Sequence, residues 1–169
     1  SAGTSHFQEM SGGNINPTEL TAALINSQKS IPEGIRYAQS RIEGSMSMLI
    51  LTPQGLYAAR DKMGRTPVII GRKDDGMIAL QESCALHNLG FQHVRDLGPG
   101  EVVELTVDGE RTLVEPGDKM AVCSFLWVYY GFPTSNYEGR NVEMMRYDSG
   151  RLMGEEDQTE VDYVCGIPD

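Results

Sequence analysis

Apolar positions in the first part of the chain recur at the spacing of a helix. Residues 16–28 place Leu20 and Leu24 on one face, behind a capping Asn16 and a proline suited to the first turn. Residues 30–44 repeat this plan, from a capping serine to a terminal glycine. The pattern therefore predicts two consecutive amphipathic helices.

Beyond these helices the apolar positions alternate, as is typical of extended chain. Predicted strands occupy residues 45–52, 55–61, 67–73 and 77–81, followed by a hairpin over 100–116 that turns at Asp108-Gly109. Residues 82–88 suit a short helix or turn. The apolar run 120–132 predicts a buried strand, because it is rich in β-branched and aromatic side chains.

The chain closes with a predicted helix over residues 138–158 and an isolated strand over 160–169. Helices packed on antiparallel strands define the α+β class, which we predict here. The last strand has no obvious neighbour, so we expect it to open a further domain.

Composition narrows the classes of partner. The formal net charge of −10 disfavours a nucleic acid, because proteins that bind one present a basic face. No apolar run reaches the ~20 residues that span a bilayer, and the start of the chain lacks the regions of a signal peptide. Three cysteines without metal-ligand spacing indicate a reducing compartment. We therefore expect a cytoplasmic protein without nucleic-acid or membrane partners.

Several polar groups could carry chemistry, but each has a structural interpretation that we favour. Asp74-Asp75 before a glycine is typical of a solvated hairpin turn more than of a metal site. Residues 11–13, Ser-Gly-Gly, follow no strand and suit a flexible linker more than a pyrophosphate loop. The histidines show no metal-ligand spacing, and Cys84 lies among apolar residues as a buried, inert thiol would.

Two polar pairs stand at predicted strand ends. We interpret Arg60-Asp61 as a structural ion pair that locks a loop, with Arg65 able to reach the same aspartate or a ligand. Glu82 and Ser83 are expected to cap the following turn. Residue types alone assemble no nucleophile, base and oxyanion hole. We therefore predict no catalytic, substrate-binding or metal-binding residue in this chain.

The segment AARDKMGRTPVIIG resembles the ARDPxGxRPL motif of class II glutamine amidotransferases, whose nucleophile is N-terminal. QESCAL resembles the SExxAL motif that follows it, and DLGPGEVVELTVDG resembles the D-x-x-PGE hairpin of the same domain. The residues that match as structural parts of this glutaminase domain are Arg60, Asp61, Gly64, Arg65, Pro67, Glu82 and Ser83. The resemblance implies part of a four-layer αββα sandwich with antiparallel sheets.

Two later segments narrow the resemblance to amidophosphoribosyltransferases. Residues 123–154 are similar to the family's C-x-x-E-x-V-Y-F-A-R-P-D-S stretch and its G…V…R…G-x-x-L continuation. The ending VDYVCGIPD is similar to the strand that opens the phosphoribosyltransferase domain. Asparagine synthetases continue instead into an SGGxDS loop. The resemblance implies transfer of the glutamine amide nitrogen to phosphoribosyl pyrophosphate, giving 5-phosphoribosylamine in de novo purine synthesis.

The departures from this family concern its active groups. The family attacks with an N-terminal Cys, but Ser1 stands here in an unlike segment, and the HxRYST and Asn-Gly motifs are absent. Pro17 occupies the position of the Asp that holds the glutamine amino group, and GFPTS replaces ARPDS. Cys123 matches one ligand of the iron–sulfur cluster of some members. One thiolate cannot hold a cluster that needs four, so we interpret Cys123 as a buried thiol.

The resemblance implies three parts: residues 1–15 as a disordered or tag-like segment, 16–160 as the C-terminal part of a glutaminase domain, and 161–169 as the first strand of a truncated phosphoribosyltransferase domain. We expect this chain alone to be inactive and to hold no cofactor. The parent protein is expected to use glutamine, phosphoribosyl pyrophosphate and Mg²⁺, with an iron–sulfur cluster as a less favoured addition.

Missing strands would leave unpaired sheet edges, so a homo-oligomer is predicted. The alternative function is a catalytically dead interaction or regulatory module that pairs with a separate glutaminase chain.

Overall fold

The computed structural model describes residues 9–10 and 14–167, and the chain divides into two compact units, Ser1–Cys123 and Ser124–Asp169. The elements of the first unit are β1 (Glu9–Met10), β2 (Asn14–Ile15), α1 (Pro17–Asn26), α2 (Ile31–Arg41), β3 (Met48–Thr52), β4 (Gly55–Ala59), β5 (Ile69–Lys73), β6 (Gly76–Leu80), α3 (Cys84–Asn88), β7 (Gln92–Asp96), β8 (Val102–Thr106) and β9 (Gly109–Val114). Those of the second are η1 (Leu126–Tyr130), β10 (Asn136–Tyr137), β11 (Arg140–Asn141) and α4 (Val142–Glu156). The structure does not describe Ser1 or the Ser-Gly-Gly segment 11–13. The expectations stated above for these residues therefore lie outside the described part of the chain.

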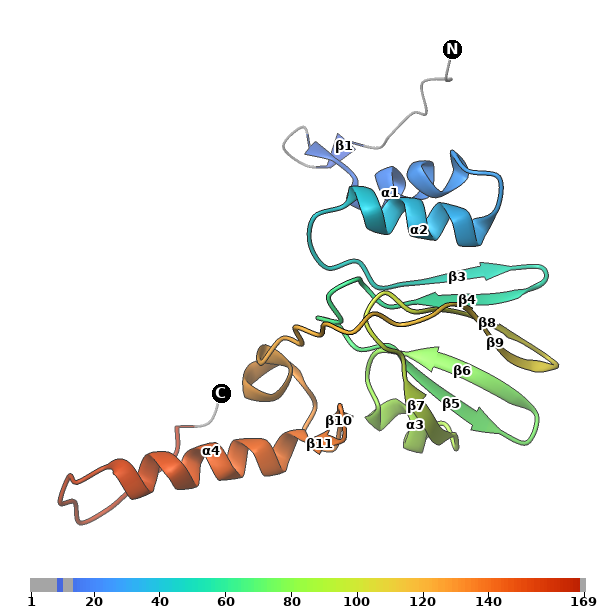
Figure 1. The fold of residues 1–169 in the computed structure, drawn as a ribbon. Helices are drawn as coiled ribbons and strands as arrows, with labels where there is room; N and C mark the ends of the chain where they lie inside the picture. The colour runs from blue at the N-terminus through green and yellow to red at the C-terminus, as the bar shows by residue number, and fades with distance from the viewer. Residues whose placement is uncertain (1–8, 11–13, 168–169) are drawn as a thin grey trace. The chain divides into compact units, whose positions relative to one another are not determined.

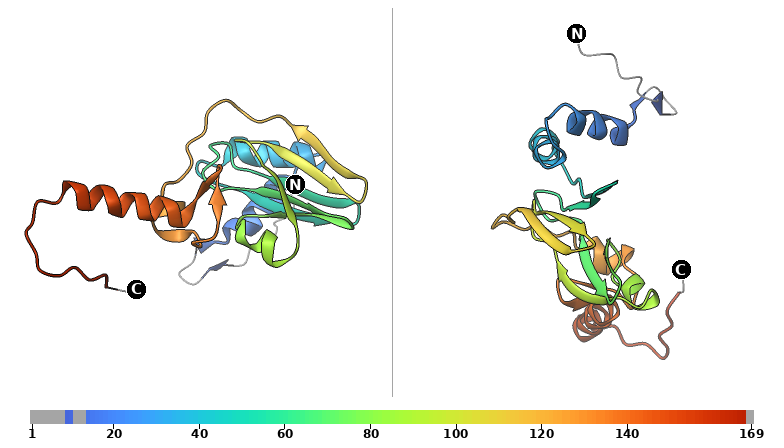
Figure 2. Two further views of the ribbon diagram at one scale, coloured as in Figure 1. Left: turned by 90° about the horizontal axis from the view of Figure 1, so that it is seen from below. Right: turned by 90° about the vertical axis from the view of Figure 1, so that its right-hand side faces the viewer.

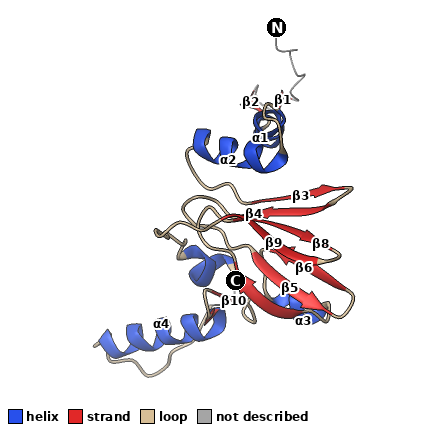
Figure 3. Cartoon of the chain, turned by 45° about the vertical axis from the view of Figure 1, so that its right-hand side comes forward, coloured by secondary structure: helices blue, strands red, loops and turns tan. Residues whose placement is uncertain are grey.

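Two antiparallel sheets stack in the first unit. One has the strand order β3-β4-β8-β9 and the other β6-β5-β7. Helices α1 and α2 cover the outer face of the four-stranded sheet, and the three-stranded sheet lies on its other face (Figure 1). Figure 3 shows the same succession of layers. The predicted α+β class is therefore confirmed.

A separate apolar core fills each interface between layers. Ile25, Ile35 and Ala38 of the helices pack on the four-stranded sheet, joined by Ala59 and Val102 from the sheet itself. Between the two sheets lie Ala58, Val68, Ile70, Ala79, Leu97, Val103 and Leu105. Neighbouring residues of β4 and β8 thus alternate between the two cores, as the period of a strand requires.

The helix caps match the sequence. The Asn16 side chain accepts a hydrogen bond from the Thr18 amide at 2.9 Å, and that of Ser30 accepts one from the Glu33 amide at 3.4 Å. A proline occupies the first turn of each helix, where its lack of an N–H costs nothing. Both predicted helices are confirmed, although the second ends at Arg41, before the expected terminal glycine.

The outer face of the three-stranded sheet carries α3. A Cβ on Gly71 of β5 would lie 2.3 Å from a methyl carbon of Leu86 in α3, so only glycine allows this approach. Figure 2 shows α3 against this sheet. The expected short helix within residues 82–88 is thus confirmed.

One strand of this sheet, β7, was not predicted from the sequence. Its residues read QHVRD, and only one of them is apolar. A strand at a sheet edge can be polar on both faces, so it gives no alternating signal.

In the second unit, the predicted buried strand over residues 120–132 is wrong. Residues 126–130 instead form η1, closed by a bond from the Gly131 amide to the Leu126 carbonyl at 2.7 Å. Only Leu126 and Trp127 of this helical turn are buried. Within residues 124–167 the only strands are the two-residue β10 and β11, so the apolar run has no sheet edge to join.

The predicted strand at the end of the chain is also not formed over residues 161–167, while 168–169 lie outside the described part. Val164 and Ile167 there are 88% and 93% exposed. A strand needs a partner for its backbone groups, and residues 124–160 offer it none. The predicted helix before it is confirmed, but it begins at Val142, where the Asn141 side chain caps the Met144 amide.

Candidate functional site

The loop after β4 carries the first five motif residues, Arg60 to Pro67. Arg60 is fully buried, and its guanidinium donates to the carbonyl of Leu97 at 2.5 Å and to that of Gly64 at 2.7 Å. Its own carbonyl accepts from the Gln39 side chain at 2.9 Å. Arg60 therefore ties this loop to α2 and to the segment that follows β7.

The Asp61 carboxylate is held by a ring of donors, three from its own loop and one from the segment before β3. The amides of Met63, Arg65 and Thr66 donate to it at 3.0, 3.2 and 3.1 Å, and the Ser45 hydroxyl at 3.1 Å. Burial raises the pKa of Asp61, but these hydrogen bonds outweigh it and hold the pKa below the ordinary value. The carboxylate is therefore ionised at neutral pH and already bonded, which suits a structural group better than a catalytic base.

These bonds of Arg60 and Asp61 go to different partners. The Arg60 side chain donates to backbone carbonyls, and the Asp61 side chain accepts from amides and hydroxyls. Arg65 reaches Asp61 through its backbone amide, while its side chain is exposed. The loop is thus locked through the backbone rather than through side-chain pairing alone.

Gly64 and Pro67 allow the loop to turn back. Gly64 has φ +65, and a Cβ there would lie 3.1 Å from the Met120 side chain and 3.3 Å from that of Pro99. A side chain would be strained by the backbone and crowded by these neighbours. Pro67 is fully buried at the end of the loop, two residues before the start of β5 at Ile69.

A hollow of about 480 Å³ opens beside this loop. Its lining residues are Pro17, Thr18, Thr21, Ser45, Met46, Ser47, Met48, Thr66 and Gln81. The fold thus brings the start of α1, the segment leading into β3 and the locked loop to one place. Five lining side chains carry hydroxyls, but none is His, Cys, Lys, Asp or Glu. A hydroxyl needs an adjacent base to be a strong nucleophile, and the carboxylate that Ser45 contacts, Asp61, is a weak base because its pKa is held below the ordinary value. These residues therefore suit binding and framing.

Ser45 and Ser47 belong to this arrangement, although we did not identify them from the sequence. The Ser45 hydroxyl bonds that of Thr66 at 2.6 Å, and the Ser47 hydroxyl accepts from the Asp61 amide at 3.1 Å. Two serines spaced by two at the start of a strand place both hydroxyls on one face, which is the signal available beforehand.

The second motif pair, Glu82 and Ser83, lies at the start of α3. Their carbonyls accept from the amides of Ala85 and Leu86, both at 3.1 Å. Ser83 occupies the cap position, but its side chain makes no capping bond to the helix, so this part of the expectation is wrong. Its φ of −65 and ψ of −24 are already helical, whereas a capping side chain needs an extended backbone.

The remaining candidates occupy separate places. Asp75 lies in the β5–β6 turn and is 3.6 Å from Lys73, which confirms a solvated turn. His93 pairs with Asp96 at 2.8 Å. Cys84 is partly buried, but Cys123 is exposed, which contradicts its interpretation as a buried thiol. The strand that would have buried Cys123 does not form, so strand alternation does not apply there.

The described residues form no cluster of metal ligands. There, no three His, Cys, Asp or Glu side chains gather closely enough to hold a metal ion. No helix in the described part of the chain is both long enough and apolar enough to cross a membrane.

Known proteins resemble this chain over most of its length. No protein-family profile matches it. An amidophosphoribosyltransferase of Archaeoglobus fulgidus is 30% identical over 154 residues, which are 90% of this chain and 34% of that protein. One of Drosophila melanogaster is 33% identical over 156 residues, covering 82% of this chain and 29% of that protein.

The fold agrees with this similarity. The glutamine phosphoribosylpyrophosphate amidotransferase of Bacillus subtilis, solved with ADP and GMP, superposes with a TM-score of 0.81 at 27% identity. The match covers 93% of this chain and 34% of that one, and it supports the N-terminal-nucleophile hydrolase architecture. The chain spans about a third of the length of the curated relatives it matches. Over that third, the chain is similar to the amidophosphoribosyltransferases in both sequence and fold.

Proposed function

We propose that this chain is part of an amidophosphoribosyltransferase, which moves the amide nitrogen of glutamine to phosphoribosyl pyrophosphate. The products are 5-phosphoribosylamine, pyrophosphate and glutamate, and the reaction belongs to de novo purine synthesis. Similarity over 90% of the chain to a relative of that name supports the proposal. The transferase reaction itself would use residues outside these 169.

The role of this chain is inferred from the locked loop and from the hollow beside it, whose lining residues include no acid or base. Asp61 and Arg60 hold the loop through the backbone, and Thr66 presents the loop to the hollow. We infer that the chain frames the glutamine site, while the attacking thiol and the oxyanion donors come from elsewhere. Preorganised framing of this kind keeps reacting groups in register.

The cofactors are assigned to the parent protein and not to this chain. Mg²⁺ is proposed for the parent protein, at the phosphoribosyl pyrophosphate. The described residues here fit neither this ion nor an iron–sulfur cluster, because they form no group of three or more suitable ligands. No step in this chain is therefore assigned to a metal. A cytoplasmic location and a homo-oligomer are proposed as well, the first because Cys84, Cys123 and Cys165 form no disulfide.

The proposal is tested by separating this chain from the natural gene product. The 169-residue chain should release no glutamate from glutamine, because the hydroxyls in the hollow meet only the Asp61 carboxylate, whose pKa is too low for a useful base. The natural gene product should release pyrophosphate from phosphoribosyl pyrophosphate when given glutamine or ammonia. Glutamate release by the chain alone, or no pyrophosphate release by the gene product with either nitrogen source, would contradict the proposal.

The second candidate, a catalytically dead interaction module, is favoured by Pro17. This residue lines the hollow at the N-terminus of α1, where the resembling motif has an aspartate for the glutamine amino group. If the gene product accepts ammonia but not glutamine, Pro17→Asp should raise the glutamine-dependent rate by about tenfold, the worth of one charged hydrogen bond. Pro32→Asp, in the first turn of α2, is the matched control and should change neither rate.

A further inference from the structure

The segment that follows β9 lies along the locked loop before the first unit ends. Its residues 117–123 are called the clamp segment here. The Ala121 amide donates to the Met63 carbonyl at 2.7 Å, and the Cys123 amide donates to the Arg65 carbonyl at 3.3 Å. The clamp segment is therefore bonded to the loop through backbone amides.

Gly64 lets the clamp segment approach the loop closely. A Cβ on Gly64 would lie 3.1 Å from the Met120 side chain, so any side chain there would crowd the clamp segment. The side chains of Ala121 and Cys123, in contrast, are exposed. The loop is bonded to the backbone amides of these two residues, so the sequence carries no side-chain signal of the contact.

The clamp segment and Asp61 hold opposite ends of one peptide group. A peptide group is planar, so its carbonyl and its amide can only turn together. In the group that joins Arg65 to Thr66, the carbonyl accepts from the Cys123 amide. The amide of the same group donates to the Asp61 carboxylate at 3.1 Å. Rotation of this group would break both bonds, so its orientation is fixed.

The peptide group that joins Met63 to Gly64 is held in the same way. Its carbonyl accepts from the Ala121 amide, and its amide donates to the Asp61 carbonyl at 2.9 Å. Without the clamp segment, both peptide groups would keep only their bonds to Asp61. The clamp segment therefore supplies the outer bonds of the loop, and Asp61 supplies the inner ones.

Thr66 carries this arrangement to the hollow of about 480 Å³, which it lines together with Ser45 and Ser47. The Thr66 hydroxyl lies 2.6 Å from that of Ser45, and the Thr66 carbonyl accepts from the Ser47 hydroxyl at 3.3 Å. The position of Thr66 depends on the peptide group that precedes it. A change in the clamp segment should therefore move this wall of the hollow.

We propose that Ala121 and Cys123 are positioning residues for the glutamine site, and that their backbone amides act on it through Thr66. Small displacements of a group that frames a ligand weaken binding and orientation. The assignment to glutamine rests on the proposed function, because that function makes the hollow part of the glutamine site. The contact between the clamp segment and the loop lies within the first unit and can be tested separately.

Amide hydrogen exchange of Thr66 in the 169-residue chain tests the contact without an assay of activity. Cys123→Pro removes the amide donor, so the Thr66 amide should exchange about fivefold faster, the worth of one hydrogen bond. Val122→Pro is the matched control, because the Val122 amide bonds no other group among the described residues. Cys123→Ser keeps the amide and should show the original exchange.

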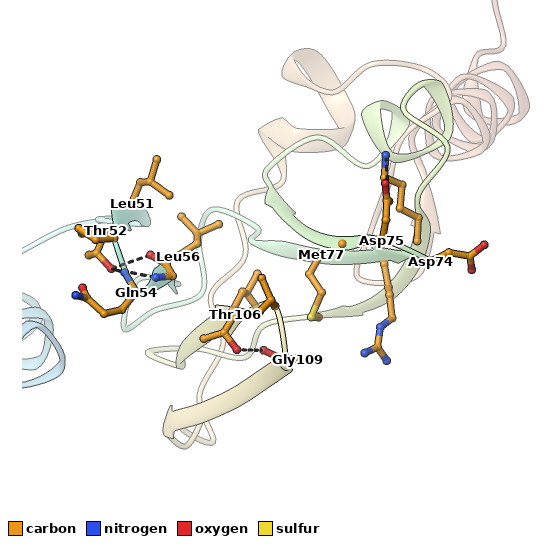
Figure 4. Close-up of a pocket in the computed structure, with 16 residues that line it drawn as sticks. Leu51, Thr52, Gln54, Leu56, Asp74, Asp75, Met77, Thr106 and Gly109 are labelled. Atoms are coloured by element: carbon orange, nitrogen blue, oxygen red, sulfur yellow. Dashed lines mark hydrogen bonds and ion pairs between the residues drawn. The ribbon is translucent and has the colours of Figure 1, made fainter.

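The Gln54 amide is the internal reference for this measurement. It is also bonded to a side-chain oxygen, Thr52 Oγ1 at 3.2 Å, in a turn that lines a separate hollow of about 670 Å³ (Figure 4). Its exchange should be the same in every variant. Equal Thr66 exchange in Cys123→Pro and Val122→Pro would overturn the proposal, and so would an equal acceleration at Gln54, which indicates general loosening.

The natural gene product tests the link to glutamine. Cys123→Pro should raise the KM for glutamine by about fivefold and leave the ammonia-dependent rate unchanged, because ammonia bypasses the hollow. Val122→Pro should change neither. An unchanged KM, an equal loss of both rates, or a gene product that uses only ammonia would overturn the positioning role. If the gene product uses neither nitrogen source, the proposed function fails, and Thr66 exchange still decides whether the clamp segment holds the loop.

Discussion

At the scale of single residues, the buried charges of the candidate site are stabilised by hydrogen bonds with the backbone. Arg60 donates to two carbonyls, and Asp61 accepts from three amides. A buried charge without such partners would cost several kcal/mol. The Arg-Asp motif therefore fixes the course of a loop, and its charged groups have a structural role.

Replacing Asp61 should remove part of this stability. Asp61→Asn is expected to lower the free energy of unfolding by about 1–3 kcal/mol at neutral pH, because charged hydrogen bonds are lost. The folded pKa of Asp61 lies below its unfolded value, so its contribution is complete above the unfolded pKa of ~3.9 and is lost as pH falls through the folded pKa. Urea unfolding at pH 7 and in acid should show the difference shrinking.

Asp74→Asn is the control for this measurement. Asp74 lies exposed in the β5–β6 turn, so its replacement should change the unfolding free energy by less than about 0.5 kcal/mol. An Asp61→Asn protein as stable as the original at pH 7 would show that the ring of donors contributes nothing.

At the scale of elements, one arginine of α4 links this helix to η1 in the second unit. Arg146 of α4 donates to the carbonyls of Trp127, Tyr129 and Gly131 at 2.7, 3.1 and 2.9 Å. These carbonyls belong to η1 and its end, and without a donor they would be unsatisfied or hydrated. The planar fork of arginine reaches all three, which a lysine cannot do.

Arg146→Lys should therefore loosen η1 against α4. Trp127 is the single tryptophan and is buried, so its emission should shift to longer wavelength and become more accessible to iodide. The loss of stability in this unit should be about 1–3 kcal/mol. Arg151→Lys changes an exposed residue of the same helix and should leave the emission unaltered. Unchanged emission in Arg146→Lys would refute this role.

At the scale of the whole first unit, one ion network connects the two sheets at the edges formed by β7 and β9. Arg95 of β7 donates to Glu101 at 3.0 and 2.6 Å and also to Glu110 of β9. Glu101 is 2% exposed and also accepts from the Gly98 amide at 2.7 Å. These bonds raise the pKa of Arg95, Glu101 most of all, so the arginine stays charged.

Glu101→Gln should destabilise the first unit by about 1–2 kcal/mol, because Arg95 loses one of its two charged partners but is partly screened by solvent and keeps Glu110. Thermal unfolding followed by circular dichroism measures this. Glu115→Gln, on the exposed segment after β9, is the matched control and should be close to neutral. If both variants unfold at one temperature, the network does not hold the sheets together.

The sequence by itself determined the features that depend on local pattern. Asn16 and Ser30 marked two helix starts, alternation marked the strands around the Pro53 and Asp108 turns, and the Arg60 motif indicated the family. Helix caps, turns and strand periods involve neighbours in the chain, so they are legible without a fold.

The tertiary structure decided whatever depends on distant partners. The run around Trp127 has the composition of a strand, but it meets no sheet edge among residues 124–167 and is bonded by Arg146 instead. Strand β7 is polar in sequence and exists because β5 offers it an edge. The hydrogen bond between the Ser45 and Thr66 hydroxyls joins residues that are distant in the sequence, so only the fold brings them together. Backbone groups take the partners that the fold supplies, and a pattern along the chain cannot state which those are.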